Sequence, residues 1–105
     1  MNEQFYVAGF KFHEGMLRIN NINEGDEVIL VHEPENPYDE NAIRVGHDGV
    51  DLGYVPKAIN QEILPSLEGQ SHLVGEVIES NKETAFDEPW KAVKVLVTDE
   101  EDEVA

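Results

Sequence analysis

One segment near the middle of the chain reads Glu33-Pro34-Glu35-Asn36-Pro37-Tyr38-Asp39-Glu40-Asn41-Ala42-Ile43. It separates two apolar runs, at residues 28–31 and 43–45. Its prolines fix φ and lack the backbone donor that a sheet needs, so neither flanking strand can continue through it. Its Asn and Asp side chains can hydrogen-bond nearby backbone groups. The sequence therefore predicts a stiff loop between two strands, which presents Tyr38 beside Asp39.

Apolar residues that alternate or cluster predict strands on both sides of this loop. The expected strands are residues 5–12, 26–32, 42–45, 50–55, 73–79 and 90–97. Four adjacent apolar residues in the second of these predict a strand covered on both faces. Asp48-Gly49 favours a tight hairpin, because both residue types tolerate positive φ. Six short strands at close spacing predict a small closed or nearly closed barrel.

The helical pattern is confined to residues 58–67. Ile59, Ile63, Leu64 and Leu67 form one apolar stripe there. Pro65 predicts that the helix ends near Leu64. Residues 16–25 are expected to form a loop with one helical turn. The predicted fold class is mainly β, a six-stranded OB-like barrel with one or two short helices.

Length and composition limit the alternatives. A chain of 105 residues suits one domain, expected at residues 1–98, and the five consecutive acids at 99–103 predict a disordered tail over residues 99–105. The absence of cysteine excludes disulfides and cysteine nucleophiles. The start of the chain lacks a signal-peptide pattern, and no apolar run reaches the roughly 20 residues of a membrane span. A soluble, cytoplasmic protein is expected.

The segment at 33–43 resembles the signature of HIRAN domains, small β-rich modules found at the front of certain DNA-repair helicase-like proteins and alone in bacteria. Two flanking segments extend the resemblance in the expected order. They are Phe-Tyr-Val-Ala-Gly-Phe-Lys-Phe at residues 5–12 and Leu-Gly-Tyr-Val-Pro-Lys at residues 52–57. The resemblance implies an OB-like barrel with short helices at its side. It also implies a non-catalytic module that binds single-stranded DNA and prefers a free 3′ end.

The same resemblance implies a set of DNA-binding residues: Lys11, Phe12, His13, Asn36, Tyr38, Asp39, Tyr54 and Lys57. Tyr38 and Phe12 would hold the terminal base by stacking, which is worth about 1–3 kcal/mol per base. Asp39 would accept a hydrogen bond from the 3′-hydroxyl and would repel a 3′-phosphate. Lys11 and Lys57 would meet phosphates.

Each of these residues also has a purely structural interpretation. Phe12 can belong to the core, and Tyr38 can cover the barrel as a lid. Asp39 can cap its own turn, and Lys57 can be a solvated residue at a helix start. Gly53-Tyr54 can form a barrel bend with a buried ring.

The net charge of −16, from 7 basic and 23 acidic residues, is unusual for a DNA-binding protein. The alternative function is therefore an acidic protein-interaction domain that keeps the fold without binding DNA. A groove that gathers Lys11, Arg44 and Lys57 and excludes acids would favour DNA, whereas acids in that groove would favour a protein partner.

Catalytic motifs are missing from the sequence: it has no nucleophile elbow and no phosphate-binding glycine loop. The histidines lack the spacing of metal ligands. They are His13, His32, His47 and His72. We therefore expect no enzyme activity, no metal and no cofactor.

Overall fold

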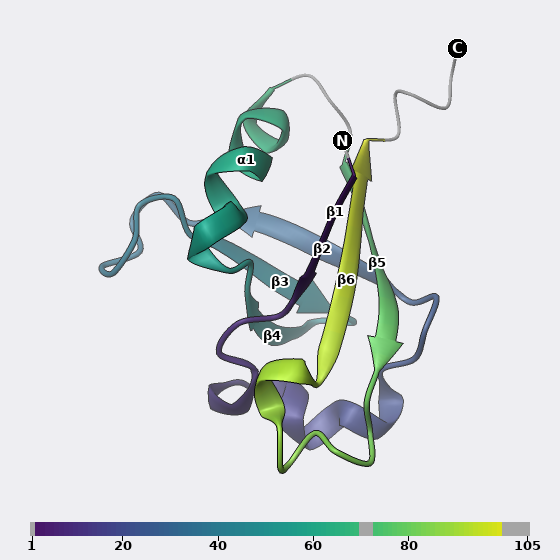
Figure 1. The fold of residues 1–105 in the computed structure, drawn as a ribbon. Helices are drawn as coiled ribbons and strands as arrows, with labels where there is room; N and C mark the ends of the chain where they lie inside the picture. The colour runs from purple at the N-terminus through teal and green to yellow at the C-terminus, as the bar shows by residue number, and fades with distance from the viewer. Residues whose placement is uncertain (1, 70–72, 100–105) are drawn as a thin grey trace.

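The computed structural model describes residues 2–69 and 73–99. Within them, six antiparallel strands form one curled half-barrel in the order β1-β6-β5-β2-β3-β4 (Figure 1). The strands are β1 (Asn2–Tyr6), β2 (Glu27–His32), β3 (Ile43–His47), β4 (Val50–Tyr54), β5 (Leu73–Ser80) and β6 (Val93–Asp99). The helices are α1 (Lys57–Glu68) and the 3-10 segments η1 (Phe10–Phe12), η2 (Glu14–Asn21) and η3 (Pro89–Lys91). The predicted mainly β fold class is confirmed.

A backbone bridge ties the two edges of this strand order together. The backbone N–H groups of Ala8 and Tyr54 donate to each other's carbonyls, at 2.8 and 2.9 Å. Gly53 makes this approach feasible, because its φ is +141° and a Cβ at this position would collide with the Ala8 carbonyl oxygen. The bridge therefore holds the segment after β1 against the end of β4.

The first predicted strand is too long. β1 ends at Tyr6, and Gly9 then turns the chain with φ +70° into η1. The turn breaks the two-residue alternation, so Phe10 is buried at 1% exposure whereas Phe12 is 76% exposed. Residues 11–13 therefore lie on a helical turn and its exit, not at the end of a strand.

The prediction that the strand at 26–32 is covered on both faces is wrong. Val28 is buried, but Ile29 is 60% exposed and Val31 is 36% exposed. A curled sheet has a single interior, and among the described residues no helix packs over the outer face of β2 at Ile29. Four adjacent apolar residues therefore reflect β propensity here, not burial on both sides.

The other departures concern element ends. α1 continues through Pro65 to Glu68, because packing of Ile63, Leu64 and Leu67 against the core outweighs the one backbone bond that proline removes in the last turn. The last strand begins at Val93, and η2 (Glu14–Asn21) is longer than the one helical turn expected in the loop at residues 16–25. The hairpin prediction is confirmed, with φ of 49° at Asp48 and 79° at Gly49.

Residues 99–105 were predicted to form a disordered tail. Asp99, the first of them, is instead the last residue of β6. The rest of that prediction, residues 100–105, lies outside the described residues, as does His72.

Candidate functional site

The loop between β2 and β3 holds its own shape. Asn36 Oδ1 accepts hydrogen bonds from the backbone N–H groups of Tyr38 and Asp39, at 2.9 and 3.2 Å. The base of the loop is closed by a bond from the Glu33 N–H to the Ala42 carbonyl at 2.8 Å. The loop projects from the barrel (Figure 1), and the Tyr38 ring at its tip is 91% exposed. The predicted rigid presentation of Tyr38 is therefore present, and the interpretation of this ring as a lid is wrong.

Asp39 is held from two sides. Its Oδ1 accepts the Asn41 backbone N–H at 2.9 Å, and its Oδ2 accepts the Asn60 side-chain amide of α1 at 2.9 Å. These hydrogen bonds, from Asn41 first and Asn60 second, lower the pKa of Asp39, and the nearby charge of Lys57 adds to the effect. Asp39 thus caps its turn, as its structural interpretation predicted, and stays ionised at the foot of the Tyr38 loop.

Asn60 was missed by the sequence analysis. It is 1% exposed, and within the described residues its Oδ1 has no hydrogen-bond partner. A signal was present, because Asn60 precedes Ile63 and Leu64 by three and four residues and so shares their buried helix face. A polar residue on an apolar helix face usually bonds to something specific. Here the Asn60 side-chain amide fixes the orientation of the Asp39 carboxylate.

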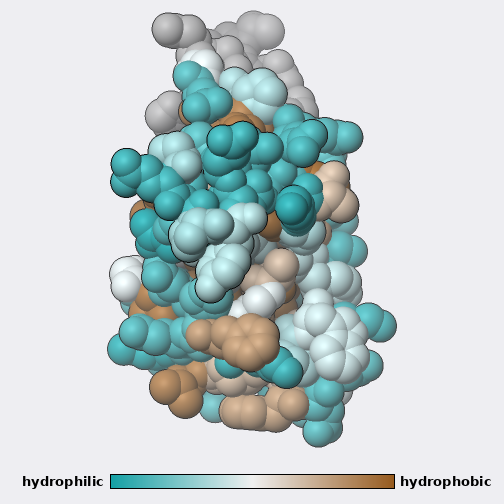
Figure 2. Space-filling view, turned by 90° about the vertical axis from the view of Figure 1, so that its left-hand side faces the viewer, coloured by the Kyte–Doolittle hydropathy of each residue, from teal (hydrophilic) through white to brown (hydrophobic). Residues whose placement is uncertain are grey.

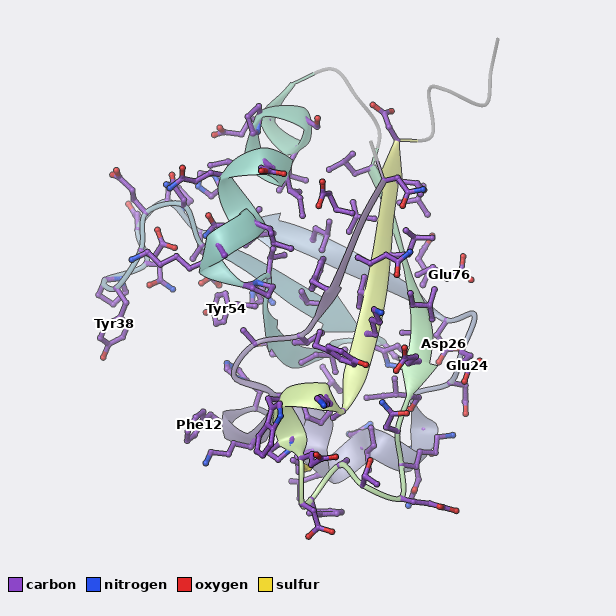
Figure 3. The ribbon with its side chains drawn as sticks, viewed as in Figure 1. Phe12, Glu24, Asp26, Tyr38, Tyr54 and Glu76 are labelled. Atoms are coloured by element: carbon purple, nitrogen blue, oxygen red, sulfur yellow. The ribbon has the colours of Figure 1, made fainter. Side chains whose placement is uncertain are left out.

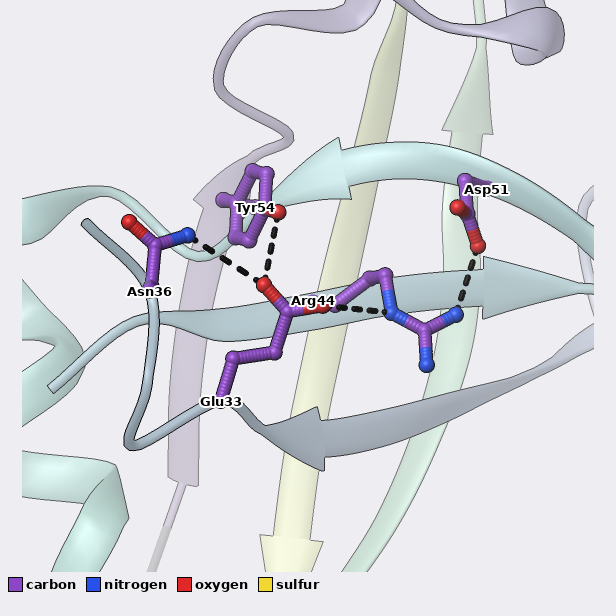
Figure 4. Close-up of polar contacts among 5 residues, drawn as sticks. All are labelled: Glu33, Asn36, Arg44, Asp51 and Tyr54. Carbon is purple, nitrogen blue, oxygen red and sulfur yellow. Dashed lines mark hydrogen bonds and ion pairs between the residues drawn. The ribbon is translucent and has the colours of Figure 1, made fainter. Parts of the chain in front are cut away.

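A network of charges lies under the loop (Figure 4). Glu33 accepts hydrogen bonds from Tyr54 at 2.7 Å, Asn36 at 3.2 Å and Arg44 at 3.0 Å. Burial alone would raise the pKa of Glu33, but these three donors lower it. Arg44 also donates to Asp51 at 2.6 Å. Arg44 is therefore committed to two carboxylates.

His13 connects the η1 region to this network. Its Nδ1 donates to the Gly9 carbonyl at 2.8 Å, since a carbonyl oxygen can only accept. Its ring meets the half-buried Tyr54 ring edge-to-face, with the centroids 5.6 Å apart. The hydrogen bond from Tyr54 to Glu33 raises the pKa of Tyr54, so this hydroxyl stays protonated. The two rings form a wall beside the loop.

Most of the predicted residues share one groove, made of two adjoining clefts. The larger, of about 770 Å³, is lined by His13, residues 33–38 and Tyr54. The smaller, of about 380 Å³, is lined by Ala8, Asn36, Tyr38, Asp39, Ala42, Tyr54, Val55 and Lys57. We call their union the loop groove. It brings together His13, Asn36, Tyr38, Asp39, Tyr54 and Lys57.

Lys11 and Phe12 lie outside the loop groove. They line a neighbouring cleft of about 500 Å³ that shares only His13 with it. Phe12 faces solvent with the Lys11 Nζ 5.0 Å from its ring centroid, so its interpretation as a core residue is wrong. Figure 3 shows Phe12 and Tyr38 pointing outward from different parts of the chain. The two rings therefore line different clefts.

Trp90 is a second residue whose position the sequence did not predict. It was assigned to a strand, but it lies in η3 and is 61% exposed. With Phe12 it lines a small cleft of about 140 Å³. Proline at the first position of η3 starts the turn that directs Trp90 outward. The face toward the loop is hydrophilic overall, with hydrophobic atoms gathered in its lower part (Figure 2).

The groove does not gather cations. Lys57 lines it, Lys11 lines the neighbouring cleft, and Arg44 is paired with Glu33 and Asp51. Glu33 and Glu35 line the larger cleft, although the charge of Glu33 is balanced by Arg44. Glu33, Glu35 and Asp39 line the groove with Lys57, so the groove combines rings and amides with an excess of acids over cations.

The sequence matches the HIRAN domain profile over residues 2–101. The chain belongs to the HIRAN domain family. It is 28% identical over 85 residues to the helicase-like transcription factor of Oryctolagus cuniculus, a match that covers 80% of this chain and 8% of that protein. It is 34% identical over 64 residues to the Fanconi-associated nuclease 1 homolog of Arabidopsis thaliana, which covers 60% of this chain and 7% of that protein. The chain thus spans less than a tenth of each of these relatives.

Two solved structures share the fold of this HIRAN domain. The HIRAN domain of human HLTF has a TM-score of 0.74 at 22% identity, covering 93% of this chain and 74% of that one. A protein from Lactobacillus plantarum has a TM-score of 0.75 at 20% identity, covering 92% of this chain and 95% of that one.

None of the helices among residues 2–69 and 73–99 is long and apolar enough to span a membrane. The same residues contain no cluster of three or more potential metal ligands.

Proposed function

We propose that this HIRAN domain is a non-catalytic module that binds single-stranded DNA at a free 3′ end. The observation that carries the proposal is the pairing of an exposed ring, Tyr38, with an ionised carboxylate, Asp39, on a loop held by internal hydrogen bonds. A ring without other contacts offers a stacking face for any base. The names of the relatives, a helicase-like factor and a nuclease homolog, also refer to nucleic acid.

In this proposal the terminal base stacks on Tyr38, and its 3′-hydroxyl donates to Asp39. Lys57, in the same cleft as Asp39, meets the last phosphate, and Asn36 and Tyr54 complete the walls. The strand then continues past His13 to Phe12 and Lys11, which line the neighbouring cleft. Phe12 is therefore proposed to stack a base further from the end. A cytoplasmic role in DNA repair or replication-fork processing goes with this proposal.

A second candidate function has its own support. Glu33 and Glu35 line the larger cleft, which favours an acidic protein-interaction domain in which the same groove binds a protein. Phosphates avoid such a wall unless the acids are neutralised. Arg44 is shared between Glu33 and Asp51, and Glu35 and Asp39 also line the groove, so the charge of the groove favours the protein-interaction function. The exposed Tyr38 ring beside Asp39 favours DNA.

Fluorescence anisotropy with short oligonucleotides that end in a 3′-hydroxyl or a 3′-phosphate tests the proposal. The full-length protein should bind the hydroxyl form more tightly, and Tyr38→Ala should weaken binding of both. Ile29→Ala is the matched control, because Ile29 is also exposed but lies outside both clefts. If the protein binds neither oligonucleotide at any salt concentration, the DNA proposal fails and the protein-interaction function replaces it.

A further inference from the structure

The outer face of the half-barrel carries an exposed apolar strip. Ile29 and Val31 of β2 point away from the core, since the alternating residue Val28 is buried. The residue opposite Ile29 in β3 is Gly46, which has no side chain to cover it. On the neighbouring strands, Val74 of β5 and Leu96 of β6 are half-buried and also point outward. Within the described part of the chain, the strip is therefore an apolar sheet face that stays accessible while the interior is filled by the core.

Two carboxylates oppose each other on the same face. Glu27 of β2 and Glu76 of β5 are directly paired across the antiparallel ladder, and both are exposed. Like charges in this position destabilise a sheet, because the Cβ atoms of opposite residues lie only about 4.5–5.5 Å apart. Within the part of the chain that the structure describes, neither carboxylate has an ion pair or a hydrogen bond.

Elsewhere on these strands, a glutamate is paired with a lysine of the same chain. Glu79 of β5 is opposite Lys94 of β6, and their side chains form an ion pair at 3.7 Å. Lys82, whose charge acts on Asp26, donates to Asn23. Among residues 2–69 and 73–99, Glu27 and Glu76 have no such paired cation, so their negative potential is available to a molecule outside the chain.

We propose that this outer-face patch, formed by Glu27, Ile29, Val31, Val74, Glu76 and Leu96, docks a basic segment of another protein. The segment is one in which lysine or arginine alternates with apolar side chains. Its cations lie between the two opposed carboxylates, and its apolar side chains cover Ile29 and Val31. The net charge of −16 attracts such a partner over a longer range.

Charge argues against a second copy of this chain as the occupant. A symmetric contact through the patch would place two Glu27–Glu76 pairs against each other on molecules that each carry a charge of −16. The acidic end of the patch is also separate from the loop groove, whereas Val31 lies opposite Arg44, which pairs with Glu33 of the groove. In Figure 3, Glu76 points outward on the side of the barrel opposite Tyr38. The domain can therefore hold a protein partner and a DNA end at the same time, and the docking proposal does not rest on the DNA proposal.

The test uses the isotopically labelled full chain and two synthetic peptides of equal charge. One alternates arginine with valine, and the other alternates arginine with serine. The valine peptide should shift the NMR signals of β2 and β5 around Ile29 and Glu76, and should bind more tightly than the serine peptide. Replacing both acids, Glu27→Gln with Glu76→Gln, should weaken binding by about 2- to 30-fold, the range expected for two exposed ion pairs.

The control variant, Glu62→Gln with Glu83→Gln, removes the same charge from exposed positions outside the patch. Equal weakening by the control, or signal changes centred on the loop groove, would overturn the proposal. So would displacement of the peptide by Mg²⁺ or Ca²⁺ alone at matched ionic strength, because the pair would then be a cation site. The docking proposal would also be overturned if the protein dimerises as its concentration rises and if Glu27→Gln with Glu76→Gln strengthens that dimer. Binding of the 3′-hydroxyl oligonucleotide should be equal in the patch and control variants, which separates the two proposals.

Discussion

Asn60 of α1 donates a hydrogen bond of 2.9 Å to Oδ2 of Asp39, and so connects the helix to the loop that carries Tyr38. The two residues are 21 positions apart in the sequence. Because Asn41 fixes the other oxygen, the carboxylate has one orientation relative to the loop groove. This relationship makes the orientation of the Asp39 carboxylate dependent on a residue that does not itself line either cleft.

The first prediction concerns end selectivity. Asp39→Asn should reduce discrimination between 3′-hydroxyl and 3′-phosphate oligonucleotides, because the amide is a weaker acceptor and carries no repelling charge. Asn60→Leu should reduce the same discrimination, although Asp39 keeps its charge. Anisotropy titrations of both oligonucleotides measure it. Unchanged discrimination in Asp39→Asn would remove this carboxylate from the site.

The second prediction concerns stacking. Tyr38→Ala should weaken binding of single-stranded DNA by about 1–3 kcal/mol, the usual loss for one base platform. The melting temperature should change little, because the ring is 91% exposed. Phe10→Ala is the contrasting variant, since Phe10 is 1% exposed and its truncation should cost about 3–5 kcal/mol of folding free energy. A large loss of stability in Tyr38→Ala with unchanged affinity would contradict the assignment.

The third prediction concerns acid stability. The folded state lowers the pKa of Asp39, so its ionised form is favoured by folding. This contribution to the free energy of unfolding is fully present above the unfolded-state pKa, about 3.9, and is lost as the pH falls through the lower folded-state value. The stability difference between the wild type and Asp39→Asn should therefore shrink below about pH 4. Urea denaturation across an acid series measures it, with Glu40→Gln, at an exposed position in the same loop, as the control.

The fourth prediction concerns the opposed acids of the outer face. Glu76→Lys should raise the free energy of unfolding by about 0.2–1 kcal/mol, because it replaces a repulsive cross-strand pair with an attractive one. Glu62→Lys makes the same change of charge on an exposed face of α1 and serves as the control. A gain no larger than that of the control would show that Glu27 and Glu76 do not repel each other appreciably.

The fifth prediction concerns salt. Lys57 and Lys11 are the cations available to the proposed DNA path, so two phosphate contacts give a salt slope near −1.4, at about −0.7 per phosphate on a single strand. Deleting residues 100–105 removes four acids and should raise DNA affinity mainly at low ionic strength. The deletion starts after Asp99 because Asp99 belongs to β6. Equal effects of the deletion at low and high salt would contradict this view.

Local chemistry allowed several features to be predicted from the sequence. Pro34, Pro37 and the Asn and Asp residues between the strands define the loop, since their effects act within a few residues. Asp48-Gly49 defines the hairpin for the same reason. The helical stripe around Ile63 is likewise local, and its burial follows from periodicity. The loop, the second strand of the hairpin and the helix carry five of the eight predicted site residues into one groove, and His13 joins them from the segment between η1 and η2.

Only the tertiary structure decided which groups meet across long sequence separations. The hydrogen bond of Asn60 to Asp39 depends on where α1 packs, and the opposition of Glu27 and Glu76 depends on the register between β2 and β5. The outward direction of Ile29 depends on the barrel having one interior. Composition and periodicity describe one segment at a time, whereas register and packing are set jointly by all the segments that share the core. For that reason the sequence by itself determined the loop and its ring, and the fold determined which groups surround them.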